Sequence, residues 1–171
     1  MPSTEAHAKW SIAVLLTALL QTASAAPAKA HWFDFWVGQW TVSWVNPDGS
    51  PGRGRNQIRK ILEDQVIEEQ FEGEAGSTPP ALLGRSLTVL QKGAGEWRQA
   101  WADNQGGFFA FTGGLDGETR YFATEFKALK GQRMRFYDIQ ADSFTWDWEG
   151  SNDGGKTWTL LWRLHYHRAR S

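Results

Sequence analysis

Residues Phe33 to Trp40 read Phe-Asp-Phe-Trp-Val-Gly-Gln-Trp, a stretch that sets four large aromatic side chains and one glycine just before a strand pattern. Apolar and polar residues alternate from Trp40 through Thr41-Val42-Ser43-Trp44, which is typical of a half-buried strand. We therefore expect a tight turn at Gly38 that enters a first strand. The upstream aromatics then fold back as a short helical plug over the end of a barrel.

The residues before this stretch have the pattern of a secretory signal. Lys9 precedes the uncharged residues 10–20, and Ala23-Ser24-Ala25 supplies the small residues of a cleavage site. The apolar run is shorter than the roughly 20 residues that a membrane-spanning helix needs. We expect residues 1–25 to be a cleaved signal peptide and residues 26–171 to form one domain, periplasmic or secreted, with no membrane anchor.

The composition narrows the functional classes. The chain contains no cysteine, which excludes disulfides, thiolate metal sites and cysteine catalysis. Its formal net charge of −1 gives no long-range field that favours nucleic acid. Ten of the eleven tryptophans lie after the predicted signal peptide, and with ten phenylalanines and three tyrosines they must be mostly buried or line a cavity. We expect neither a nucleic-acid partner nor a cofactor or metal, and a small apolar or aromatic ligand is the favoured partner.

Period-two alternation, interrupted by glycine, proline, asparagine and aspartate, predicts about ten strands in succession. Short connections between sequential strands indicate an antiparallel up-and-down meander, and a meander of this length avoids exposed edges by closing. The predicted fold class is an all-β barrel with a short N-terminal helical plug. The expected strands are 40–45, 56–62, 66–73, 82–91, 97–102, 108–112, 120–127, 133–139, 144–149 and 158–167.

The alternation also predicts which side chains face the lumen. We expect the aromatic face of each strand to point inward. This places Trp97 and Trp101 inside, followed by Phe144, Trp146 and Trp148 in the ninth strand and by Trp158, Leu160, Trp162, Leu164 and Tyr166 in the tenth.

Gly38-x-Trp40 at the start of a meander barrel resembles the signature of the calycin group, which contains the lipocalins and fatty-acid-binding proteins. In lipocalins a basic residue near the end of the last strand covers that tryptophan, so the resemblance implies this role for Arg163 or Arg168. Two segments, Phe33 to Trp40 and Ser151 to Trp158, are together similar to an uncharacterised family of exported bacterial barrel proteins, a domain of unknown function. That likeness spans about residues 33–168, implies a calycin-like barrel and carries no established catalytic residues.

The octet Ser151-Asn152-Asp153-Gly154-Gly155-Lys156-Thr157-Trp158 is similar to the Asp-box of sialidases and related β-propellers. Propellers repeat the motif, whereas this chain has it once. We interpret it as a structural hairpin in which Asp153 caps the turn, the glycines adopt positive φ and Trp158 packs.

One carboxylate is predicted to face the lumen. Alternation sends Glu69 inward with Ile67 and Phe71, and an isolated buried charge costs several kcal/mol, so it must be paired or protonated. Arg85 on the neighbouring strand is the candidate partner, because its face with Leu83, Leu87 and Val89 is apolar enough to point inward. The pair is interpreted either as a structural ion pair or as a polar anchor or general acid/base.

Two histidines are candidates for a metal or haem ligand. His165 and His167 share one face of the last strand with Arg163, and this polar face is expected to lie outside. Our leading hypothesis is a barrel that binds a small, largely apolar ligand. Its alternatives are a barrel enzyme that uses Glu69, a haem-binding barrel through His165 and a filled barrel whose working surface lies outside. The predicted ligand-binding residues are Glu69, Arg85, Trp97, Trp101, Trp146, Trp148 and Trp162.

Overall fold

The computed structural model describes residues 28–76 and 81–170, so the predicted signal peptide lies outside the described residues. Two short 3-10 helices, η1 (Lys29–His31) and η2 (Asp34–Trp36), precede the strands. The strands are β1 (Gly38–Val45), β2 (Pro51–Ile61), β3 (Val66–Gly73), β4 (Leu83–Gln91), β5 (Glu96–Asp103), β6 (Phe108–Asp116), β7 (Thr119–Ala123), β8 (Gly131–Tyr137), β9 (Ser143–Ser151) and β10 (Thr159–Arg168). No helix in these described ranges is long and apolar enough to span a membrane.

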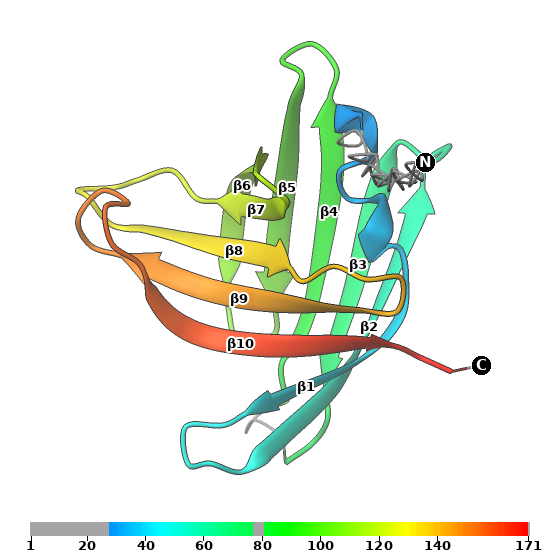
Figure 1. Ribbon diagram of the computed structural model, residues 1–171, viewed down its shortest axis with the longest axis vertical. Coiled ribbons are helices and arrows are strands. Elements are labelled where there is room, and N and C mark those ends of the chain that lie inside the picture. The colour runs from blue at the N-terminus through cyan, green and yellow to red at the C-terminus, as the bar shows by residue number, and fades with distance from the viewer. Residues whose placement is uncertain (1–27, 77–80, 171) are drawn as a thin grey trace, which may run out of the picture.

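The ten strands form one closed antiparallel barrel, as the sequence predicts (Figure 1). Each strand pairs with its neighbours in the chain, and β1 pairs with β10 to close the circle, with Trp40 opposite Arg168 and Ser43 opposite His165. Three strand boundaries differ from the prediction by four residues or more. β2 already begins at Pro51, and proline is tolerated as the first residue of a strand. β6 continues to Asp116, and β7 ends at Ala123.

Two glycine-containing strands allow large indoles to lie flat against the lumen wall. A Cβ on Gly52 of β2 would collide with the ring of Trp44, and a Cβ on Gly84 of β4 would collide with the ring of Trp101. Each glycine therefore provides space for a tryptophan on the neighbouring strand. This pairing of small and large residues shapes the open end of the barrel.

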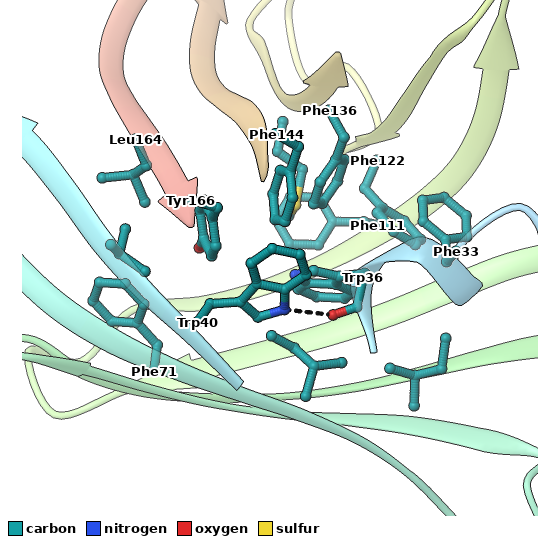
Figure 2. Packing of buried hydrophobic residues seen from close by; sticks show 14 of the residues in the cluster. Phe33, Trp36, Trp40, Phe71, Phe111, Phe122, Phe136, Phe144, Leu164 and Tyr166 are labelled. Carbon is teal, nitrogen blue, oxygen red and sulfur yellow. Dashed lines mark hydrogen bonds between the residues drawn. The ribbon is translucent and has the colours of Figure 1, made fainter. Parts of the chain in front are cut away.

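The N-terminal aromatics close the other end of the barrel, as predicted. Figure 2 shows Phe33 and Trp36 packed among the inward side chains of the strands. Phe33 is fully buried and stacks on Phe122 with ring centroids 4.4 Å apart, and it meets Trp97 edge to face at 5.2 Å. The indole of Trp97 also donates to the carbonyl oxygen of Lys29 at 2.8 Å, which ties the segment to β5.

Trp40 is 1% exposed and is covered by a basic side chain, in agreement with the calycin resemblance. Its Nε1 donates to the carbonyl oxygen of Trp36 at 2.8 Å (Figure 2). The guanidinium of Arg168 lies 4.3 Å from the centroid of the Trp40 ring. Arg163, the other candidate, instead donates two hydrogen bonds of 2.7 Å to Asp147, which lies buried on the outward face of β9.

The inward face predicted for the start of the last strand is wrong for two residues. A bulge interrupts the pairing of β10 with β9 between Leu160 and Trp162, so the side chains before it change face. Leu160 is 45% exposed. Trp158 packs outside the barrel, where the guanidinium of Arg133 lies 4.0 Å from the centroid of its ring. The inward assignment is correct after the bulge, from Trp162 to Tyr166.

The Ser151 to Trp158 octet forms the predicted structural turn between β9 and β10. Asp153 accepts hydrogen bonds from the backbone amides of Lys156 and Thr157, both at 3.0 Å, and from the Thr157 hydroxyl at 2.6 Å. These hydrogen bonds, led by that hydroxyl, lower the pKa of Asp153 to about 2. Gly154 and Gly155 adopt φ of +76° and +85°.

The plug should contribute strongly to stability. We expect Phe33→Ala to lower the free energy of unfolding by about 3–5 kcal/mol, because it leaves a cavity among rigid aromatic rings. The control is Val45→Ala in β1, whose side chain is 72% exposed and whose change should stay within about 0.5 kcal/mol. Urea denaturation followed by circular dichroism measures both, and equal effects would show that the segment does not support the barrel.

Candidate functional site

The lumen contains a cavity of about 160 Å³ that is lined mainly by aromatic side chains. For comparison, an engineered apolar cavity of about 150 Å³ binds benzene. The cavity therefore suits a ligand of one or two rings. Its lining residues are Trp36, Glu69, Phe71, Leu82, Trp101, Asp103, Phe109, Phe111, Met134, Trp146, Trp148, Trp162, Leu164 and Tyr166.

The indoles at the open end of the barrel are held by polar side chains of the adjoining turns. Trp101 donates from Nε1 to Asp103 Oδ2 at 2.9 Å. The other oxygen of Asp103 accepts from the backbone amides of Gln105 and Gly107, at 2.9 and 2.8 Å. Partial burial alone would raise the pKa of Asp103, but the Trp101 and backbone hydrogen bonds outweigh it and lower that pKa. The mouth of the cavity thus carries an ionised carboxylate.

A cluster of buried polar side chains occupies the inner wall of β2 to β5 and β10, and we call it the polar cluster. Its centre is Glu69, which is 6% exposed and pairs in register with Ile58 of β2 and Ser86 of β4. Glu69 and Tyr166 are the two members that also line the cavity. The polar cluster consists of Asn56, Glu69, Ser86, Thr88, Gln99 and Tyr166.

Neutral donors hold the Glu69 carboxyl group. Its Oε1 accepts from Asn56 Nδ2 at 2.7 Å, and its Oε2 accepts from Ser86 Oγ at 2.7 Å. Asn56 Nδ2 also donates to the hydroxyl oxygen of Tyr166 at 3.1 Å. Gln99 Nε2 donates to the Ser86 hydroxyl at 3.3 Å and to the Thr88 hydroxyl at 2.9 Å. These bonds fix the orientation of Glu69 before any ligand arrives.

Burial changes the proton affinity of the two ionisable members of the polar cluster. Removal from water raises the pKa of Glu69, and the hydrogen bonds from Ser86 and Asn56 only partly oppose this effect. Burial also raises the pKa of Tyr166, and the nearby Glu69 raises it further. Both groups therefore favour their neutral forms in the free protein.

Three buried polar atoms in the described part of the chain lack a hydrogen-bond partner. They are Asn56 Oδ1 and Gln99 Oε1, both acceptors in the polar cluster, and Nε1 of Trp36, a donor on a residue of the cavity wall. Unpaired buried polar atoms are costly and uncommon, so such a group calls for a specific explanation. Their concentration around the lumen makes this region the candidate functional site.

The structure brings together most of the predicted site residues. Glu69 faces the cavity as predicted, and the four predicted tryptophans that line the cavity with it are Trp101, Trp146, Trp148 and Trp162. Their role in ligand binding stays a prediction.

Two predicted site residues lie elsewhere. Trp97 faces inward but packs under the plug and does not line the cavity. The inward face predicted for Arg85 is wrong: the side chain points outward, where it donates to the carbonyl oxygen of Gly84 and lies 3.8 Å from Glu72. The inner face of β4 instead carries Gly84, Ser86 and Thr88. The predicted Glu69–Arg85 ion pair does not form.

Sequence reasoning missed several members of the site, although part of the signal was present. One face of β2 carries three charged side chains, those of Arg53, Arg55 and Arg59, and a face with three charges is expected to point outward. Asn56 lies on the opposite face, so this pattern predicts that it points inward. Gln99 lies between the inward Trp97 and Trp101, so alternation would have placed it inside too. Trp36 carries no comparable signal, because its direction depends on how the plug folds.

The histidine candidates lie on the outer surface, as expected. His165 and His167 are exposed on β10, and His165 pairs in register with Ser43 and Thr145. Within the described ranges, no group of three or more histidine, aspartate or glutamate residues is arranged to hold a metal ion.

Comparison with known proteins supports the fold. No protein-family model and no curated protein matches the sequence. The structure is similar to that of the S-type phycobiliprotein lyase CPES from Guillardia theta, with a TM-score of 0.52 and 15% sequence identity. The match covers 82% of this chain and 92% of that chain. At this identity the likeness shows the fold alone: the chain is a ten-stranded, lipocalin-like β-barrel.

A second structural match is weaker. A protein of unknown function from the DUF3598 family of Nostoc punctiforme matches with 10% identity and a TM-score of 0.27, over 84% of this chain and 100% of that chain. This likeness is too low to support any argument about fold or function.

The buried Glu69 should make stability depend on pH. The pKa of this carboxyl group is raised in the folded protein, so its contribution is fully present below the unfolded value, near 4.5, and is lost as pH rises through the folded value. We expect the wild type to lose stability relative to Glu69→Gln over this window. Urea denaturation at a series of pH values measures the difference, and a difference that does not change with pH would show that Glu69 is not desolvated.

Proposed function

We propose that this protein binds a small, largely apolar ligand with one or two rings inside its barrel. The observation that carries the proposal is the cavity of about 160 Å³ that five indoles line around Glu69. Apolar pockets with a few converging polar groups are the usual small-molecule sites in proteins. The likeness to the lyase supports a lipocalin-like fold only and contributes no ligand.

The size of the cavity argues against the haem alternative. Pockets for drug-sized ligands usually measure about 300–1,000 Å³, and a haem is larger than most such ligands. His165, the candidate axial ligand, points away from the lumen on the outer face of β10. Haem would need both a larger lumen and a side chain that points inward to serve as its axial ligand.

The enzyme alternative rests on the raised pKa of Glu69, which suits a general acid. Among the described residues, the Ser86 hydroxyl is the nucleophilic group that donates a hydrogen bond to this carboxyl group, and Ser86 does not line the cavity. A ligand in the cavity would therefore meet the carboxyl group but not a nucleophile–base pair. Binding is the function that the arrangement favours, and export through residues 1–25 and membership of the exported bacterial family stay predictions.

A size series of neutral aromatic compounds tests the proposed binding. We expect propylbenzene and indole to bind with a negative heat-capacity change, because apolar surface is buried, and the four-ring compound pyrene not to bind. Isothermal titration calorimetry and tryptophan fluorescence measure the binding. Failure of propylbenzene and indole to bind or to raise the melting temperature would refute the proposal.

A matched pair of variants in β10 locates the ligand. Leu164→Phe fills part of the cavity and should weaken propylbenzene binding at least about tenfold, at a stability cost of about 1–3 kcal/mol. Leu161→Phe adds the same ring on the outer face, where Leu161 is 54% exposed, and should leave binding unchanged. Circular dichroism confirms that both variants fold, and equal binding by both would place the ligand outside the lumen.

A further inference from the structure

We propose that the ligand is a small primary amine that carries an aromatic or short apolar group and binds as its ammonium ion. Its nitrogen lies at Glu69, and its apolar part lies against the indole walls of the cavity. The inference rests on the proposed ligand-binding function and adds to it the charge and hydrogen-bonding character of the head group.

The ionisable side chains that line the cavity are all acids. Asp103 at the mouth is ionised, Glu69 at the inner wall favours its neutral form until a cation approaches, and the described residues that line the cavity include no lysine or arginine. No ion pair to Glu69 occurs in the described part of the chain, and its hydrogen-bond donors are the neutral side chains of Asn56 and Ser86. A cleft lined by one sign of charge attracts the opposite sign and repels its own. The cavity therefore favours a cation and disfavours a carboxylate ligand.

The polar cluster has more acceptors than donors to fill them. A carboxylate offers about four lone-pair sites, and the described residues donate one hydrogen bond to each oxygen of Glu69. Asn56 Oδ1 and Gln99 Oε1 are further acceptors without a partner among the described residues, but neither residue lines the cavity. An ammonium group carries three N–H donors and no acceptor, so it complements the remaining lone pairs of Glu69 better than a hydroxyl or a carbonyl group does.

The indole walls also suit a cation that carries an apolar group. Trp146 and Trp148 stack in parallel, with centroids 6.4 Å apart and an interplanar angle of 5°. Trp162 meets Trp146 edge to face at 6.0 Å and 89°, so the two rings form a corner. Indole is the best side chain for cation–π attraction, and desolvation strengthens it. The same surfaces accept the apolar part of the ligand.

Binding of an ammonium ion reverses the protonation preference of Glu69. Burial favours the acid form in the free protein, whereas an opposite charge within about 4–6 Å favours the carboxylate. The carboxyl proton therefore leaves to solvent as the ammonium enters. Tyr166 of β10 is the other titratable group facing Glu69 among the described residues, and β2, β4 and β5 present the uncharged Asn56, Ser86 and Gln99.

Four probes of similar size and different head group test the inference by calorimetry. They are phenethylamine, 2-phenylethanol, phenylacetate and propylbenzene. We expect phenethylamine to bind the wild type at least about tenfold more tightly than 2-phenylethanol, since hydrogen bonds to charged groups are stronger than neutral ones. Phenylacetate should bind most weakly, and phenethylamine binding should release protons at a pH where Glu69 is in its acid form.

Two isosteric variants on β3 assign the effect to one carboxyl group. Glu69→Gln should weaken phenethylamine binding at least about tenfold and abolish its proton release, while propylbenzene binding stays within about threefold and shows that the lumen is intact. Glu72→Gln removes an outward carboxylate that lies near Arg55 and Arg85, and it should bind all four probes as the wild type does.

The outcomes separate the inference from the function on which it rests. If propylbenzene binds but 2-phenylethanol binds as tightly as phenethylamine, or if Glu69→Gln binds the amine normally, the amine inference is overturned and the apolar binding function stands. If no probe binds the wild type, both fail. Preferential binding of phenylacetate would overturn the charge argument.

Discussion

The ladder between β1 and β10 closes the sheet, and the rest of the structure depends on this closure. A closed barrel has a single interior, so alternate residues of every strand must point into it. The interior is narrow, and the chain fills it with indole and phenyl rings. Glycine at positions 52 and 84 gives two of these rings the space to lie against the wall. A residual cavity of about 160 Å³ is what remains between the aromatic plug and the open end.

The interior has two regions, the plug and the polar cluster, whose burial contributes differently to stability. Around Phe33, the rings pack against one another and the strand ends, and burial of apolar surface stabilises them. Around Glu69, hydrogen bonds from neutral side chains compensate only part of the cost of removing a carboxyl group from water. A protein that needed only stability would be better served by apolar residues there. This contrast is the reason to assign a function to the polar cluster.

Two side chains face the opposite way from the sequence prediction for a common reason. The apolar neighbours Leu83 and Leu87 predict an inward face for Arg85, yet these leucines are 47% and 53% exposed. The inner face of β4 needs small residues, because Trp101 and Glu69 from the flanking strands already occupy the space. Uninterrupted alternation predicts that Trp158 faces inward, but a bulge that the sequence does not reveal reverses its direction. In both cases the residue's own pattern was ambiguous and its neighbours across the sheet decided its direction.

The sequence by itself determined the all-β class and the ten strands, since alternation and turn residues are local properties, and a meander of ten strands implied closure. The cover of Trp40 by a late arginine was implied by the calycin resemblance. The sequence also placed Glu69 inside, because that strand alternates without interruption. Only the tertiary structure decided which side chains meet Glu69, that Trp97 supports the plug and not the cavity, and how much of the lumen stays open. These depend on register and on the volumes of side chains from four or five strands at once. No single strand encodes them, whereas the Phe33 to Trp40 stretch encodes its own strand and plug.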